Sequence, residues 1–132
     1  MALQYTVTHR NNDMSDLVTA AGATGYLIIY SGALPANVAT ADAGTILVAL
    51  PCSATLGTVA SGVLTFNAIT TTAIATSGTA GHWRLCTSAA GTTCIAQGTV
   101  GTSGADLNLS TLTLTAAVNL SISSWTVTAF GA

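Results

Sequence analysis

Histidine and aspartate are the side chains of this sequence best suited to moving protons, and both are scarce. The chain contains His9, His82 and four acidic residues, all of them aspartate. No aspartate lies close in sequence to His82, and the G-x-S-x-G and H-E-x-x-H motifs are both missing. A Ser-His-Asp site would have to be assembled from distant segments, and the scattered aspartates predict no site for a hard cation. We therefore predict that the chain is not an enzyme.

The cysteines carry the other reactive side chains, and Cys52, Cys86 and Cys94 lack the spacing of a zinc site. A three-residue hairpin loop with Gly91 in the left-handed position would place Cys86 opposite Cys94. Counting along the hairpin puts them at a hydrogen-bonded pair, whose wider Cα spacing suits a disulfide less than the narrow pair does. Residues 1–12 contain no apolar secretory segment, so we expect folding in a cytoplasm and two neighbouring thiols.

Three glycines, Gly98, Gly101 and Gly104, are spaced as G-x-x-G-x-x-G, which only loosely resembles a phosphate-binding loop. In such loops a helix follows and its N-terminus binds the anion, but no helix-forming run follows these glycines. We interpret them as turns at strand ends, and we expect no cofactor.

The charge content is low, because only 5% of the 132 residues are charged and lysine is absent. Without clustered cations, the attraction to phosphate that drives nucleic-acid binding is missing. The apolar runs at residues 27–30 and 46–50 are far shorter than the roughly 18–20 residues of a membrane helix. We expect neither nucleic acid nor membrane as a partner. Since a freely diffusing domain carries about a quarter of its residues as charges, this composition favours a structural subunit that stays among neighbours.

The length predicts one domain, residues 1–132, in which residues 1–22 form an N-terminal arm with a short helix at residues 13–21. Asn12 or Asp13 would cap this helix and Gly22 would end it. Its apolar side chains recur at helical spacing: Met14, Leu17, Val18 and Ala21. This stripe either covers one end of the protein's own β core or docks on a neighbouring subunit, with Met14, Leu17 and Val18 as candidate interface residues.

The remainder of the chain reads as strands separated by glycine turns. Residues 31–44, which include Pro35, form the longest irregular stretch, and this loop is either a binding element or a plain surface excursion. The expected strands are residues 26–30, 45–52, 63–67, 70–77, 82–87, 92–100, 107–115 and 118–130. About eight short strands are typical of an antiparallel β-sandwich, and we predict a jelly-roll-like one.

The last two predicted strands form a hairpin if Ala116 and Ala117 make the turn, with apolar residues facing one another throughout. In both strands the apolar side chains change face about halfway along. This matched change is typical of a ribbon that bends from one sheet to another or is covered on both faces.

On the strand at residues 82–87, alternation places His82, Arg84 and Cys86 on one face and Trp83 and Leu85 on the other. We assign Trp83 to the core. Arg84 then lies outside, or pairs with an aspartate such as Asp106. An exposed arginine among small and aromatic residues is also typical of an interface anchor, so Arg84 joins the candidate interface residues.

Several of these segments resemble small structural proteins of tailed bacteriophages. They are YLIIYSGALPA at residues 26–36, ADAGTIL at 41–47, GHWRL at 81–85, GTTC at 91–94 and GADLNL at 104–109. In particular, the chain resembles the jelly-roll cement, or head-decoration, proteins that bind the outside of a capsid, and the resemblance covers nearly the whole chain. It implies a protein without cofactors, located on the capsid surface of a virion after assembly in a host cytoplasm.

The resemblance implies a non-catalytic role in which each copy binds the major capsid protein and stabilises the shell. Dimerisation about a two-fold axis, or another homo-oligomer, would place several binding surfaces on one unit. The competing interpretation is a tail-fibre or receptor-binding module that recognises host glycans. The low aromatic content, 5%, disfavours a glycan-binding surface.

Overall fold

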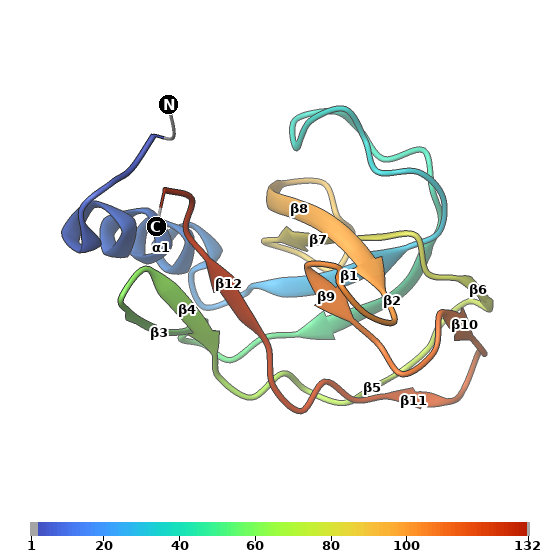
Figure 1. Cartoon of the computed structure of the whole chain (residues 1–132). Coiled ribbons are helices and arrows are strands. Elements are labelled where there is room, and N and C mark those ends of the chain that lie inside the picture. The colour runs from blue at the N-terminus through green and yellow to red at the C-terminus, as the bar shows by residue number, and fades with distance from the viewer. Residues whose placement is uncertain (1–2, 132) are drawn as a thin grey trace.

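The computed structural model describes residues 3–131 as a mainly β protein with one N-terminal helix (Figure 1). The largest sheet has the order β2-β1-β7-β8-β9 and is a curled, mixed half-barrel, because β8 and β9 pair in parallel while its other pairs are antiparallel. It comprises β1 (Tyr26–Tyr30), β2 (Ile46–Pro51), β7 (His82–Cys86), β8 (Cys94–Gly101) and β9 (Leu107–Asn108).

Three smaller sheets surround this half-barrel, so the strands are distributed over more sheets than the two of a simple sandwich. The three-stranded sheet β12-β4-β3 contains β3 (Gly57–Ala60), β4 (Val63–Phe66) and β12 (Thr126–Thr128). Two pairs complete the fold: β5 (Thr72–Ala73) with β11 (Asn119–Leu120), and β6 (Gly78–Thr79) with β10 (Thr113–Leu114).

The central strand β1 is buried on both faces, which explains its unbroken apolar sequence. Leu27 and Ile29 enter the main core, which also contains Leu64, Trp83 and Trp125. On the opposite face, a smaller cluster comprises Ile28, Tyr30 and Cys86. Something must therefore cover the outer face of the half-barrel, and the loop at residues 31–44 does so.

The helix α1 (Val7–Ala21) begins earlier than the predicted start at residue 13. Thr6 is its N-cap, and the Thr6 hydroxyl accepts a hydrogen bond from the His9 N–H at 3.2 Å. The first turns of α1 carry no apolar stripe, so the spacing of apolar residues did not predict them. Polar contacts to the β3–β4 turn hold them instead, since Asn11 Oδ1 accepts from the Gly62 N–H at 2.7 Å. The predicted end is confirmed, because Gly22 leaves the helix with φ +59°.

The strands at residues 26–30, 46–51 and 82–86 were predicted to within two residues, whereas β3 and β6 were missed. The predicted final hairpin is wrong. A turn does form at residues 115–118, but the flanking segments pair with other strands: β9 with β8, β10 with β6, β11 with β5 and β12 with β4. Each segment passes from one sheet to another halfway along, which is the bend that the change of buried face predicted.

Candidate functional site

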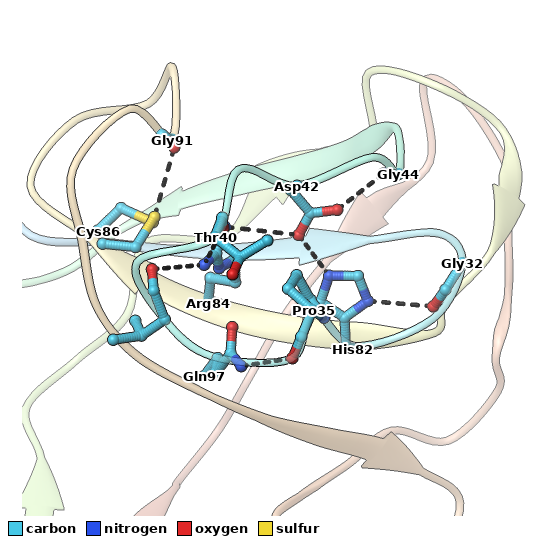
Figure 2. Close-up of polar contacts among 12 residues, drawn as sticks. Gly32, Pro35, Thr40, Asp42, Gly44, His82, Arg84, Cys86, Gly91 and Gln97 are labelled. Carbon is cyan, nitrogen blue, oxygen red and sulfur yellow. Dashed lines mark hydrogen bonds and ion pairs between the residues drawn. A yellow bond between two sulfur atoms is a disulfide. The ribbon is translucent and has the colours of Figure 1, made fainter.

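One histidine, one aspartate and one arginine meet on the outer face of the half-barrel, beneath residues 31–44 (Figure 2). Strand β7 supplies His82 and Arg84, which share this face by alternation, while Trp83 and Leu85 point into the main core as predicted. All five residues of β7 are buried, and the side chain of Arg84 is only 2% exposed. The strand therefore presents polar groups to a covered surface rather than to solvent.

His82 is fixed through both ring nitrogens. Nδ1 lies 3.1 Å from the Gly32 carbonyl oxygen, and Nε2 lies 2.5 Å from Asp42 Oδ2. Because a carbonyl oxygen can only accept, Nδ1 donates to it, and Nε2 pairs with the Asp42 carboxyl group. The ring of Tyr30 stacks on the imidazole at a centroid distance of 5.2 Å. In the described residues His82 contacts no hydroxyl or thiol that it could activate as a nucleophile.

Arg84 lies inside the molecule, so the prediction that it points outward is wrong. Its guanidinium donates to the Val38 and Thr40 carbonyl oxygens at 2.7 and 2.9 Å, and Nη1 lies 3.8 Å from Asp42 Oδ2. Arg84 does pair with an aspartate, but the partner is Asp42 rather than Asp106. Since the side chain is buried within its own chain, it does not form part of an accessible interface.

A third side chain completes this arrangement, because Gln97 Nε2 donates to the Pro35 carbonyl oxygen at 2.9 Å. We call His82, Arg84 and Gln97, together with Asp42, the loop-anchoring cluster. Each of the three sheet residues binds backbone carbonyl groups of residues 31–44, as Figure 2 shows. These contacts anchor the long loop over this face of the sheet, while most of its own residues stay at least partly exposed.

Beside the cluster, a polar cavity of about 440 Å³ lies between residues 38–44 and the hairpin tip at residues 90–92. Tyr30 borders this cavity. Burial raises the pKa of the Tyr30 phenol, the Asp42 carboxylate acts in the same direction and Arg84 opposes them. The phenol therefore remains neutral at physiological pH.

The sequence predicted that His82 and Arg84 share a face, but it did not identify Asp42 as their partner. The feature that could have pointed to Asp42 is that it is the sole charged residue of the long loop at residues 31–44.

Cys86 and Cys94 form a disulfide, so the prediction of two free thiols is wrong. The Thr87 N–H donates to the Thr93 carbonyl oxygen, which places the cysteines at the pair without mutual backbone hydrogen bonds. Cα atoms approach more closely there, with 3.8 Å between them in this hairpin. The error arose from assuming a tighter loop. Cys52 is the free cysteine of the described chain, and burial raises the pKa of its thiol to about 11.

Helix α1 packs its stripe on the protein's own core, because Met14, Leu17 and Val18 contact the main apolar cluster. The first of the two predicted placements, a cover for the β core, therefore describes the helix. The stripe is nevertheless only half-buried, because Met14 and Leu17 also line a groove of about 700 Å³. The helix wall also includes Asp13, Asp16 and Ala20. Asp106 and residues of three strands form the opposite walls: Trp83 of β7, Ile95, Ala96 and Gln97 of β8, and Thr126, Val127 and Thr128 of β12. We call this the α1–β8–β12 groove.

A second surface lies where the two ends of the described chain meet (Figure 1). The Tyr5 N–H donates to the Gly131 carbonyl oxygen at 2.9 Å, and the Tyr5 ring contacts the ring of Phe130 edge-on. Tyr5 and Phe130 are both exposed, Phe130 with 70% of its surface accessible, and Leu3 and Val7, each two residues from Tyr5 along the chain, are exposed as well. We call them the terminal apolar surface. Sequence reasoning missed it because the two segments lie at opposite ends of the chain.

The glycines predicted as strand-end turns divide between two roles. Gly104 adopts φ +69° in a turn, whereas Gly98 lies inside β8 opposite Trp83. A side chain at Gly98 would collide with the Trp83 indole, so glycine is required there for close packing.

Within residues 3–131, no three His, Cys, Asp or Glu side chains gather as metal ligands, and no helix is long and apolar enough to cross a membrane. The chain matches no protein-family model, and comparisons with curated proteins and with solved structures find no similar protein.

Proposed function

We propose that the protein is a non-enzymatic structural subunit that binds the outer surface of a tailed-phage capsid. Its partner is the major capsid protein, and its place is the surface of the virion, after assembly in the host cytoplasm. We further propose that the fold is a distorted jelly roll, in which the half-barrel corresponds to one of the two sheets and the smaller sheets together correspond to the other. Binding as a homodimer or other homo-oligomer multiplies weak contacts across the lattice.

The terminal apolar surface is the observation that carries the proposal. Four exposed large apolar side chains near the chain ends are costly to leave in water, since each exposed square ångström of apolar surface costs about 25 cal/mol. Such regions mark interaction sites in soluble proteins. A partner that covers Leu3, Tyr5, Val7 and Phe130 would remove this cost.

The distribution of the charged residues supports the same role. Of the six charged residues, Asp42 and Arg84 are buried against each other. Only Arg10, Asp13, Asp16 and Asp106 remain to repel other molecules in solution. The buried His82–Asp42 pair anchors a loop, so this pair is not placed to act as an exposed general base.

The test is co-sedimentation of the purified protein with capsids assembled without it. Phe130→Ser and Tyr5→Ser each remove apolar area from the terminal apolar surface, and each should weaken binding at least about tenfold. Val118→Ser is the matched control, because Val118 is also an exposed apolar residue but lies in the β10–β11 turn, away from the chain ends. Its binding should equal that of the unmodified protein.

Equal binding by all variants would show that the terminal apolar surface is not the attachment site. Failure of the unmodified protein to bind capsids, together with binding on a glycan array, would favour the tail-fibre alternative instead.

A further inference from the structure

We infer that the α1–β8–β12 groove binds an extended peptide segment of a partner protein, in which arginine or lysine alternates with apolar residues. This inference goes beyond the proposed capsid role and does not depend on it. Three features of the groove carry it: its apolar lining, its acidic rim and an open strand edge.

The groove is apolar along its length and acidic at its rim. Its volume of about 700 Å³ lies within the range of ligand clefts, roughly 300–1,000 Å³. Three of the chain's four acidic residues, Asp13, Asp16 and Asp106, line it. His9 Nε2 lies 3.8 Å from Asp13 Oδ1, and both side chains are exposed to solvent. A cationic side chain would find its complement here.

One wall of the groove is an edge of the largest sheet. Beyond β8 the only neighbouring strand among the described residues is β9, which pairs with Val100 and Gly101 alone. The Thr99 N–H points away from β7, because it donates to Asp106 Oδ2 at 2.9 Å. Backbone groups two residues apart point the same way, so the N–H and C=O of Gln97 also face this edge. An extended peptide adds to such an edge through main-chain hydrogen bonds.

The floor of the groove contains a polar group without a partner. Trp83 lines the groove with only 4% of its surface exposed, and its indole Nε1 has no acceptor within the described structure. Nearly all buried donors in proteins are paired. The Nε1 atom is shielded from solvent, so the indole N–H is a probe of binding close to the groove and not a contact with the peptide.

The occupant is another protein rather than a second copy of this chain. The chain has only two arginines and no lysine. Arg84 is buried in the loop-anchoring cluster, and Arg10 donates to the Ser61 carbonyl oxygen of the β3–β4 turn. In a neighbouring copy, therefore, both arginines are already engaged within that copy and neither is placed to lie between the three aspartates.

The experiment is a titration of the isotope-labelled protein with a blocked Val-Arg-Val-Arg-Val pentapeptide, followed by NMR. The shifts should concentrate at the Gln97 amide, the Trp83 indole N–H and the exposed face of α1. A pentapeptide with glutamate in place of arginine should bind at least about tenfold more weakly, because its charges face the aspartates. Asp16→Asn should weaken binding of the arginine peptide about two- to fivefold, which is the contribution of one exposed ion pair.

A pair of variants tests the location. Ala20→Trp fills the groove from the helix wall and should abolish peptide binding, whereas Thr19→Trp places the same bulk on an exposed helix position that does not line the groove. Equal affinity for both pentapeptides, or binding that survives Ala20→Trp, would overturn the inference. So would self-association that disappears in Ala20→Trp while no peptide binds, because the groove would then hold a second copy.

Discussion

At the scale of single residues, the chain uses its strongest polar groups to hold a loop. His82, Arg84 and Gln97 project from β7 and β8 and bind carbonyl groups of residues 31–44, while Asp42 returns from the loop to His82 and Arg84. Each buried charge thus has an opposite charge or several oxygen atoms beside it, as a low-dielectric site requires. The cluster fixes one conformation of the loop over an apolar sheet face.

Removing the guanidinium should leave two buried loop carbonyl groups without their donor and remove the positive charge beside Asp42. We expect Arg84→Met to lower the free energy of unfolding by about 3–5 kcal/mol, the usual cost of breaking a buried pair. Arg10→Met is the control, because Arg10 makes a single exposed contact at 3.3 Å, and it should cost at most about 1 kcal/mol. Urea denaturation followed by tryptophan fluorescence measures both. Equal losses of unfolding free energy for the two variants would show that Arg84 contributes no more to stability than Arg10 does.

The cysteines should differ in reactivity. Cys86 and Cys94 are joined, so the native protein should take up one alkyl label per chain, at Cys52. Only the thiolate reacts, and burial raises the pKa of the Cys52 thiol from 9.0 to about 11. The labelling rate should therefore keep rising with pH until about 11, whereas that of a free cysteine in solution levels off about two units lower. Mass spectrometry at a series of pH values provides the measurement, and three labels without reductant would contradict the disulfide.

At the scale of elements, α1 illustrates how a cap and a few polar contacts extend a helix beyond its apolar stripe. The stripe at Met14, Leu17 and Val18 packs on the core, but the helix begins at Val7 because Thr6 caps it. Removal of residues 1–21 would therefore strip part of the core as well as the arm, so point substitutions test the role of the arm more cleanly.

The cap makes a direct prediction. Thr6→Ala removes the hydroxyl that accepts from the His9 N–H, and it should destabilise the protein by about 1 kcal/mol. Thr8→Ala is the matched control, since Thr8 is an exposed helical residue and alanine has the higher helix propensity. This control should be neutral or slightly stabilising in urea denaturation. A cost for Thr8→Ala as large as that for Thr6→Ala would show that the helix does not begin at this cap.

At the scale of the whole molecule, two surfaces of different chemistry lie near α1. The terminal apolar surface contains no charged residue, whereas the α1–β8–β12 groove carries three of the four aspartates. Salt weakens the interaction between exposed charges, with a Debye length of about 8 Å at physiological ionic strength, but it leaves apolar burial intact.

The two surfaces should therefore respond differently to salt. Capsid attachment through the terminal apolar surface should hardly change between low and high salt, whereas binding of the arginine pentapeptide in the groove should weaken. Co-sedimentation and NMR titration across the same salt series test this difference. A steep loss of capsid binding with salt would show that charge, and not apolar burial, dominates attachment.

The sequence alone determined the features that depend on local pattern. Alternation placed Trp83 and Leu85 in the core and His82 and Arg84 on the other face, helical spacing located the stripe of α1, and the change of phase near residues 110 and 123 revealed strands that switch sheets. Strand and helix periods are properties of consecutive residues, so they can be read before the chain folds.

The tertiary structure decided which segments pair. Asp42 reaches His82 from 40 residues away, β9 pairs with β8 in parallel instead of closing the final hairpin, and Tyr5 meets Phe130 at the opposite end of the chain. The loop geometry after Cys86 likewise decided that two cysteines meet at a pair suited to a disulfide. These contacts arise because the outer face of β1 and β7 must be covered and each strand edge must find a partner, and only the packed molecule determines which segment does so.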